Sequence, residues 1–169
     1  MTDTSSVSVV IPVRNGVSLL RECLQSLTEQ EWPAGLSEIL ICDDGSTEDL
    51  RPMVEEFSGR LPGLRLLQQG PRGPAAARNL GFKSSNADIF VCIDSDLVCT
   101  QDFLSHLVSG LRRNPEWVAA ESTVLPRGKK SLLVDAPENR GGTFVSGGGA
   151  YRADAIRRAG GFDEEFPYP

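Results

Sequence analysis

The stretch IFVCIDSD, residues 89–96, contains the signal that decides the fold. Its first five residues, Ile89 to Ile93, are all apolar, and a continuous apolar run of this length is typical of a strand buried on both faces of a parallel sheet. Asp94, Ser95 and Asp96 follow directly. Two carboxylates one residue apart repel each other unless a positive charge lies between them. The stretch therefore indicates either a solvated turn or half of a metal site at the end of a buried strand.

Three further apolar runs lack polar alternation and predict strands of the same kind: Val7 to Val13, Ile39 to Cys42, and Leu64 to Leu67. Apolar residues at helical spacing lie between and after them. The members of these helical patterns are Leu20, Cys23, Leu24 and Leu27; Met53, Val54 and Phe57; Ala75 to Phe82; and Phe103, Leu104, Leu107, Val108 and Leu111. Strands that alternate with helices predict an α/β fold with a mostly parallel sheet.

The sequence also predicts where two of these helices begin. Ser46 and Asp49 are arranged as a capping box before the second helix, and Thr100 is a plausible N-cap of the fourth, with Asp102 in its first turn. His106 falls off the apolar stripe of that fourth helix and is expected in solvent. Residues 126–142 predict a loop, and the segment FVSGGGAYRADAIRRAGGF, residues 144–162, predicts a strand, a glycine turn and a short helix.

Composition excludes several classes of protein. The net charge is −6 and the basic residues form no long block, which argues against a nucleic-acid surface. The sequence has no apolar run near the roughly 20 residues that span a bilayer, and its start lacks the basic region of a signal peptide. We therefore expect a cytoplasmic protein with no membrane span. The four cysteines lack CxxC pairing and are interpreted as buried, reduced thiols.

Polar residues gather where the predicted strands end. Asp43 and Asp44 follow the second strand, where a carboxylate can accept hydrogen bonds from a ribose or a base. An Asp-Gly turn that caps a helix at Ser46 is the alternative; it explains the segment DGST but not the doubled aspartate. Because the C-terminal ends of parallel strands share one edge of the sheet, we expect Asp43 and Asp96 to line one cleft.

Two more groups at this edge suit a phosphorylated ligand. The segment GPRGPAAARNLGF, residues 70–82, combines small residues with Arg78, which could bind a diphosphate through two hydrogen bonds or lie on the surface of a helix. Asp94 and Asp96 point to the same side if the chain is extended there. Mg²⁺ or Mn²⁺ often needs only one or two carboxylates plus substrate phosphates. A solvated turn remains the alternative.

Five segments in one order carry a family resemblance: VSVVIPVRNG (7–16), ILICDDGSTEDL (39–50), GPRGPAAARNLGF (70–82), FVCIDSD (90–96) and FVSGGGAYRADAIRRAGGFDEEF (144–166). Together they resemble the inverting glycosyltransferases of family 2. The resemblance implies a three-layer, Rossmann-like GT-A fold and one nucleotide-sugar-binding domain over residues 1–169. It also implies a hexosyltransferase-like enzyme. Such an enzyme binds a nucleoside-diphosphate sugar, here a UDP-sugar, and transfers the sugar to an acceptor hydroxyl with inversion.

The resemblance also assigns roles to particular residues. Those placed near the nucleoside are Pro12, Val13, Arg14, Asn15, Asp43, which contacts the base, and Asp44. Those placed near the diphosphate and sugar are Arg78, Asp94 and Ser95. Asp96, with Asp94, would hold Mn²⁺ or Mg²⁺. Gly147 and Gly148 would border the acceptor side.

One departure concerns the catalytic base. In the family, an acidic pair that supplies the base follows the segment that GGFDEEF, residues 160–166, resembles, and this sequence ends at FPYP before such a pair. We expect the domain to be incomplete at its C-terminus, with the base beyond Pro169 and with Asp163 and Glu164 as secondary candidates.

Two alternatives to the enzyme remain open. One is a non-catalytic nucleotide-sugar-binding module. The other is a sugar-phosphate nucleotidyltransferase, which needs a glycine-rich loop after the first strand, where this chain has PVRNGVS. Neither the donor sugar nor the acceptor can be read from the sequence.

Overall fold

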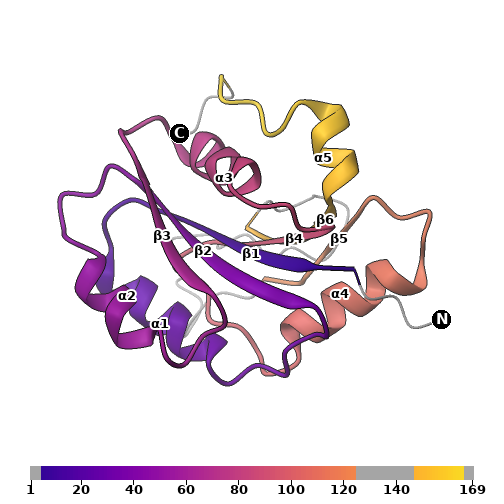
Figure 1. The fold of residues 1–169 in the computed structure, drawn as a ribbon, viewed down its shortest axis with the longest axis horizontal. Coiled ribbons are helices and arrows are strands. Elements are labelled where there is room, and N and C mark those ends of the chain that lie inside the picture. Colours follow the sequence, from indigo (N-terminus) through magenta and orange to yellow (C-terminus); the bar gives the residue numbers. More distant parts are fainter. Residues whose placement is uncertain (1–4, 125–146, 166–169) are drawn as a thin grey trace, which may run out of the picture.

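The centre of the molecule is a sheet whose first four strands run parallel (Figure 1). The computed structural model describes residues 5–124 and 147–165. The parallel strands are β1 (Val7–Val13), β2 (Leu36–Asp44), β3 (Leu64–Gln69) and β4 (Ile89–Ile93). Two further strands, β5 (Ala119–Glu121) and β6 (Gly148–Arg152), complete the order β3-β2-β1-β4-β6-β5. Because only the pairings of β6 with β4 and β5 are antiparallel, the prediction of a mostly parallel sheet is confirmed.

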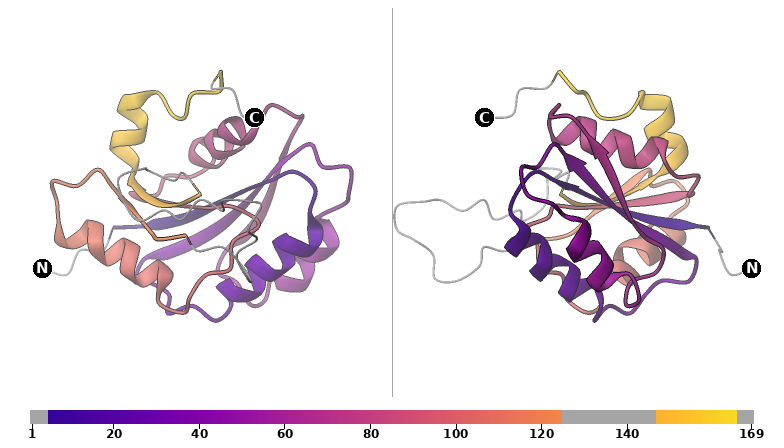
Figure 2. Two further views of the ribbon diagram at one scale, coloured as in Figure 1. Left: turned by 180° about the vertical axis from the view of Figure 1, so that it is seen from behind. Right: turned by 60° about the vertical axis from the view of Figure 1, so that its left-hand side comes forward.

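Helices cover both faces of this sheet, as Figures 1 and 2 show. One face carries α1 (Val17–Leu27), α2 (Arg51–Phe57) and α4 (Phe103–Arg113), and the other carries α3 (Pro74–Lys83) and α5 (Ala153–Ala159). The expected three-layer α/β architecture is therefore confirmed.

The two faces have separate apolar cores, which explains why the strand sequences do not alternate. Val9 and Ile11 of β1 belong to the core that includes α1, α2 and α4, whereas Val10 between them packs in the core beneath α3. All three side chains are fully buried. Successive side chains of a strand point to opposite faces, so a strand with a core on each side is apolar at every position.

Close packing fixes helix α3 on the sheet. Gly81 lies so near β1 and β2 that an added Cβ would meet Val10 Cγ1 at 2.6 Å and Cys42 Sγ at 3.1 Å. Ala76 and Ala77, on the same helix, are buried as well. Small side chains therefore bring the helix onto the strand ends, and Arg78 is placed by this contact.

Both predicted helix caps are wrong, because the side chains concerned bind other partners. Helix α2 begins at Arg51, and the Ser46 hydroxyl instead accepts a hydrogen bond from the Asn15 amide at 2.7 Å. Helix α4 begins at Phe103 after Asp102, whose carboxylate accepts a hydrogen bond from the Thr100 hydroxyl at 2.8 Å.

The C-terminal segment also differs from its prediction. Gly148 and Gly149 lie inside strand β6, and α5 follows that strand directly instead of a glycine turn. The predicted loop at residues 126–142 and the start of the predicted strand at residues 144–146 lie outside the described residues.

The cysteines were expected to be buried thiols and the histidine to be exposed, and the structure agrees except at Cys99. All four thiols are free; Cys23, Cys42 and Cys92 are buried, and Cys99 is half-buried. The His106 side chain is 71% exposed, and its ring lies beside the Asp102 carboxylate. Among the helices in the described parts of the chain, none combines the length and apolarity needed to cross a membrane.

Candidate active site

A cleft of about 370 Å³ opens at the C-terminal edge of the parallel strands. We call it the strand-end cleft. It is formed by the ends of β1, β2 and β4 and by the first turns of α1 and α3. The predicted site residues that line it are Pro12, Val13, Arg14, Asn15, Asp44, Arg78, Asp94, Ser95 and Asp96. Asp43, Gly147 and Gly148 are not part of its wall. Residues that are far apart in the sequence thus meet where the topology of a parallel sheet places ligands.

The two aspartates after β2 lie in different environments. Asp43 is 2% exposed, and its carboxylate accepts hydrogen bonds from the Ser46 amide at 2.9 Å and the Gln68 side chain at 3.1 Å. The Asp44 carboxylate accepts three at 2.8 Å, from the Gln69 side chain and from the amides of Arg72 and Gly73. The doubled aspartate therefore fixes two turns, and Asp44 rather than Asp43 lines the cleft with Asp96.

Asn15 ties the loops after β1 and β2 together. Its backbone adopts a left-handed conformation with φ 62°, which asparagine tolerates better than most residues. Its side-chain oxygen accepts hydrogen bonds from the Thr47 amide at 2.9 Å and the Thr47 hydroxyl at 3.1 Å. Arg14, next to it, is exposed. The wall of the cleft on this side is held by hydrogen bonds, and the exposed cationic side chain of Arg14 lies in it.

Arg78 is buried and is not a surface arginine. Its side chain is 3% exposed, and its Nη2 donates to Asp94 Oδ1 at 2.6 Å. On its other side, the guanidinium carbon lies 5.6 Å from the centre of the Phe162 ring. A buried cation is stable only when it is paired. This ion pair gives one of the two carboxylates after β4 a positively charged partner.

Gly147 provides the space for the Asp94 side chain. The Gly147 carbonyl accepts a hydrogen bond from the Asp94 amide at 3.0 Å, and a Cβ at position 147 would overlap the Asp94 carboxylate. A Cβ on the neighbouring Gly148 would meet Ser122 Oγ at 2.6 Å. The glycines expected at the acceptor side are therefore required by the packing of the chain around β6.

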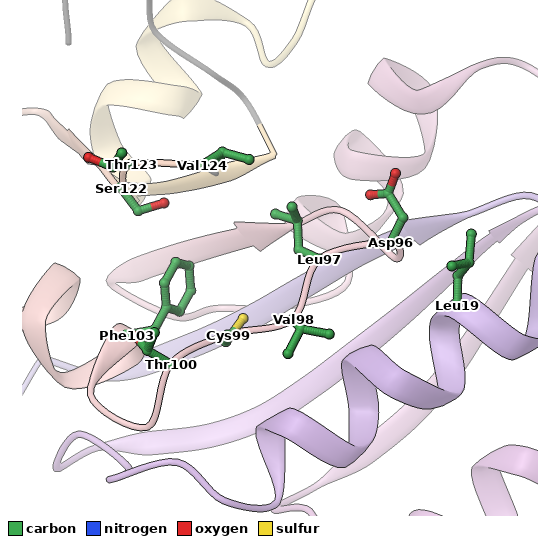
Figure 3. A pocket seen from close by; sticks show the side chains of 10 residues that line it. All are labelled: Leu19, Asp96, Leu97, Val98, Cys99, Thr100, Phe103, Ser122, Thr123 and Val124. Atoms are coloured by element: carbon green, nitrogen blue, oxygen red, sulfur yellow. The ribbon is translucent and has the colours of Figure 1, made fainter. Parts of the chain in front are cut away.

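Asp96 differs from the other acids of the cleft because it is exposed. Within the described ranges its carboxylate has no hydrogen-bond partner. It also borders a second pocket of about 620 Å³, which shares Asp96 and Leu19 with the strand-end cleft. Figure 3 shows Asp96 at one end of this pocket and Phe103 at the other, with Leu97 and Val98 between them. Asp96 thus stands between a polar cleft and a largely apolar one.

The donor set fits a metal that is held mainly by its substrate. No three His, Cys, Asp or Glu side chains of the described residues are grouped to hold a metal ion by themselves. Asp96 is open to the cleft, and Asp94 Oδ1 is engaged by Arg78. Mg²⁺ and Mn²⁺ accept carboxylate oxygens and are often bound by one or two of them together with phosphates and waters. The arrangement suits that kind of site.

The two secondary candidates for a base have other contacts. The Glu164 carboxylate binds Arg72 Nη2 at 2.6 Å and accepts a hydrogen bond from Asn79 Nδ2 at 2.9 Å. Asp163 is exposed, and its carboxylate accepts a hydrogen bond from the Glu165 amide at 2.9 Å. Sequence analysis did not single out Asn79, Arg72 or Phe162. The sequence held one signal for Asn79: it is a polar residue directly after Arg78, within a helix predicted from small and apolar residues.

Comparison with known proteins agrees with this fold. The family model described as Glycosyl transferase family 2 matches residues 8–145. The chain belongs to that family, as the sequence resemblance predicted.

Among its relatives, glycosyltransferase AglE of Haloferax volcanii is 34% identical over 61% of this chain and 34% of its own length. Poly-beta-1,6-N-acetyl-D-glucosamine synthase of Staphylococcus epidermidis is 26% identical over 75% of this chain and 30% of its own length. The chain spans about a third of the length of these relatives.

Solved structures show the same fold. The mannosyltransferase PcManGT of Pyrobaculum calidifontis, determined with GDP-Man and Mn²⁺, matches with a TM-score of 0.79 and 24% identity over 97% of this chain and 49% of its own. S. aureus TarS 1-349 matches with a TM-score of 0.75 and 22% identity over 96% of this chain and 52% of its own. The GT-A fold expected from the sequence is confirmed.

Proposed function

We propose that this chain is the donor-binding domain of an inverting glycosyltransferase, and that a nucleoside-diphosphate sugar binds in the strand-end cleft. The observation that carries the proposal is the convergence of Asp44, Arg78, Asp94 and Asp96 on one cleft at the ends of parallel strands. This set offers carboxylates for a nucleoside and a metal, and a cation for a diphosphate. The match to family 2 supports the same assignment.

The wall of the cleft suggests how the donor lies. Pro12 to Asn15 and Asp44 form the side at β1 and β2, which we assign to the nucleoside. Asp43 lies behind this wall, where it holds the turn at Ser46; its assignment to the base requires contact through that turn or a rearrangement. Asp94 and Ser95 lie at the end of β4, on the side we assign to the ribose and sugar.

Asp96 is the residue we assign to a divalent metal, with Asp94 beside it. When bound, Mn²⁺ or Mg²⁺ supplies positive charge that stabilises the departing nucleoside diphosphate. Arg78 contributes a second, fixed positive charge at the cleft, and its pairing with Asp94 keeps that charge oriented. PcManGT was determined with GDP-Man and Mn²⁺, and TarS with UDP-GlcNAc, which supports a metal-assisted donor site. A UDP-sugar is our choice of donor from the family resemblance.

The acceptor is assigned to the far side of Asp96. The second pocket shares Asp96 with the cleft, so an acceptor there would approach the sugar beside the metal. Inverting displacement also needs a base within hydrogen-bond reach of the acceptor hydroxyl. Because Glu164 is held by Arg72 and Asn79, we do not assign the base to it.

A non-catalytic binding module remains the second candidate, because the acids next to the cleft are engaged in internal contacts. The test is calorimetric titration with UDP-glucose, UDP-N-acetylglucosamine and GDP-mannose, each with Mn²⁺ and with EDTA, followed by a turnover assay of the full-length protein. Metal-dependent binding with turnover supports the enzyme, and binding without turnover supports the module. Absence of metal-dependent binding for all three donors would contradict both.

A further inference from the structure

The segment Gly160 to Glu165 is fastened to helix α3 by the side chain of Asn79. Asn79 Nδ2 donates to the Phe162 carbonyl at 2.9 Å and to Glu164 Oε1 at 2.9 Å, and its Oδ1 accepts from the Phe162 amide at 2.8 Å. Asn79 is only 5% exposed. Both N–H groups of its amide and its oxygen are therefore used, and two of the three bonds go to the backbone of one residue.

The backbone of the segment is shaped to meet this amide. Gly161 has φ 95°, a conformation that residues with a Cβ rarely adopt. A Cβ at that position would also lie 2.6 Å from Asn79 Oδ1. The glycine thus lets the chain approach the amide closely enough for the Phe162 amide and carbonyl to bond with it.

Two further contacts hold the same segment. The Glu164 carboxylate pairs with Arg72 Nη2 at 2.6 Å. The Phe162 ring packs against Phe82 and Tyr151, with centroids 5.5 Å and 5.7 Å away, and lies under the Arg78 guanidinium at 5.6 Å. One ring therefore contacts both the core and a cation of the strand-end cleft.

Helix α3 connects this segment with the cleft. Its N-cap, Gly73, donates its amide to Asp44 at 2.8 Å, and Arg78 pairs with Asp94 at 2.6 Å. Asn79 is the residue directly after Arg78, so both side chains are placed by the packing of the same helix. A displacement of the segment relative to α3 would change its place relative to the cleft as well.

We propose that Asn79 is a positioning residue: with the Arg72–Glu164 ion pair, it latches the segment Gly160–Glu165 to the donor-binding helix and so sets where the chain after Glu165 begins relative to the cleft. We call these contacts the α3 latch. The proposal rests on the proposed function and on the family resemblance, which implies that the base follows this segment. The latch then controls the rate of transfer rather than the affinity for the donor, because misplacement of reacting groups by about 1 Å can cost about 100-fold in rate.

The test uses Asn79→Asp, which removes both N–H donors and puts a carboxylate against the Phe162 carbonyl and Glu164. Hydrogen exchange followed by mass spectrometry should show amides 161–165 exchanging at least tenfold faster than in the wild type. In the full-length protein, kcat for nucleoside-diphosphate release from whichever of UDP-glucose, UDP-N-acetylglucosamine and GDP-mannose is turned over should fall at least tenfold. The KM for that donor should stay within threefold.

A charge-matched pair of double variants separates the latch from a general loss of structure. Adding Glu164→Gln to Asn79→Asp restores an N–H donor opposite position 79 and removes the repulsion between the two carboxylates. Relative to Asn79→Asp alone, the exchange of amides 161–165 should become at least threefold slower and kcat should rise at least threefold. Adding Glu165→Gln instead removes the same charge from an exposed neighbour and should restore neither. If Asn79→Asp does not fold, Glu164→Ala replaces it, because that change removes the ion pair and one amide bond but keeps the two bonds to Phe162.

Unchanged exchange of residues 161–165 in Asn79→Asp, or in its replacement Glu164→Ala, would overturn the latch. So would equal recovery by both double variants, or equal losses in kcat and in donor affinity. Failure of the proposed function has a different signature. In that case the wild-type protein turns over no donor, while the exchange measurements still decide whether the latch exists.

Discussion

The buried guanidinium of Arg78 donates to the carboxylate of Asp94 at 2.6 Å and joins helix α3 to the end of strand β4. Both residues were expected to contact substrate, and the structure shows that they also contact each other. The ion pair holds Asp94 in one orientation and leaves Asp96, two residues on, as the exposed acid of the cleft. In the proposed function, Arg78 would position Asp94, and Asp96 would be the main ligand of the metal.

The first prediction concerns this ion pair. Arg78→Ala should lower the free energy of unfolding by about 2–4 kcal/mol, because it leaves a partly buried carboxylate without its partner. Urea denaturation measures this loss. Arg158→Ala is the matched control, since it removes an ion pair whose side chains are 67% and 61% exposed; it should cost less than about 1 kcal/mol. Similar losses in the two variants would contradict the structural role given to Arg78.

A second readout of Arg78→Ala addresses its role in binding. The variant should weaken binding of UDP more than binding of uridine, because only UDP carries a diphosphate that the cation can contact. A uniform loss for both ligands would indicate damage to the fold instead.

Substitution of Gly147 should disturb the site through Asp94, whose carboxylate fills the space beside the glycine. In Gly147→Ala the new methyl group overlaps the Asp94 carboxylate, so Asp94 must turn out of its contact with Arg78. We expect at least tenfold weaker binding of UDP in Mn²⁺, measured by calorimetry. Gly110→Ala serves as the control because, apart from the chain neighbours and the backbone of its own helix, no described residue has an atom within 4 Å of the added Cβ. It lies within helix α4, where alanine should stabilise by about 0.5–1 kcal/mol. Unchanged UDP affinity in Gly147→Ala would show that Asp94 need not stay in place.

Asp44 should be the more costly of the two acids after β2 to remove. Asp44→Ala leaves the part-buried amides of Arg72 and Gly73 without their acceptor. A donor that loses its partner away from solvent costs about 1–3 kcal/mol, and less where water can replace the partner. Asp43→Ala leaves one amide, that of Ser46, in the same condition. Urea denaturation should therefore rank Asp44→Ala as less stable than Asp43→Ala. The reverse ranking would show that the turn at Ser46, and not the start of α3, depends most on this pair.

The thiols give a prediction for pH. Burial raises the pKa of Cys42 to about 12 and the pKa of Cys99 to about 11, so both remain neutral at pH 8. Only the thiolate reacts with iodoacetamide, and native Cys99 should react roughly 100-fold more slowly than the same thiol in urea. In the unfolded chain the thiols ionise near pH 8.5. Burial of the neutral thiols therefore contributes fully to the free energy of unfolding below that pH. The contribution declines as the pH rises above 8.5, because only the unfolded chain then loses the thiol protons. Rapid alkylation of the native chain at pH 8 would contradict this burial.

The sequence was sufficient for the layers of the fold because the central strands β1 and β4 are buried on both faces. Ile89 to Ile93 is apolar at every position for that reason, and its strand was predicted with the bounds that the structure shows. The same burial was expected for Leu64 to Leu67, but β3 lies at the edge of the sheet and none of its residues is fully buried, so that expectation was wrong. The helix caps were wrong because a hydroxyl or carboxylate near a helix start has other partners in three dimensions. Ser46 is bound by Asn15, which lies 31 residues away.

The candidate site could be located from the sequence but not resolved in detail. Parallel topology brings the ends of β1, β2 and β4 together, so Asp44 and Asp96 meet at one cleft. The sequence could not show that Arg78 is buried against Asp94, or that Asn79 reaches Phe162 83 residues away. Both contacts depend on how closely α3 packs on the sheet, and that distance is set by Gly81 and the neighbouring alanines.

In the proposed function, Asp96 helps to hold a metal that binds a nucleoside diphosphate in the strand-end cleft. Isothermal titration of UDP into the wild type and Asp96→Ala, each in Mn²⁺ and in EDTA, tests it most directly. The wild type should bind in Mn²⁺ and much more weakly in EDTA. Asp96→Ala should bind about 10- to 150-fold more weakly in Mn²⁺, corresponding to a charge-assisted contact of about 1.5–3 kcal/mol. Glu165→Ala, which removes an exposed acid outside the cleft, should bind like the wild type. Equal affinities of the wild type and Asp96→Ala in Mn²⁺ would contradict the account.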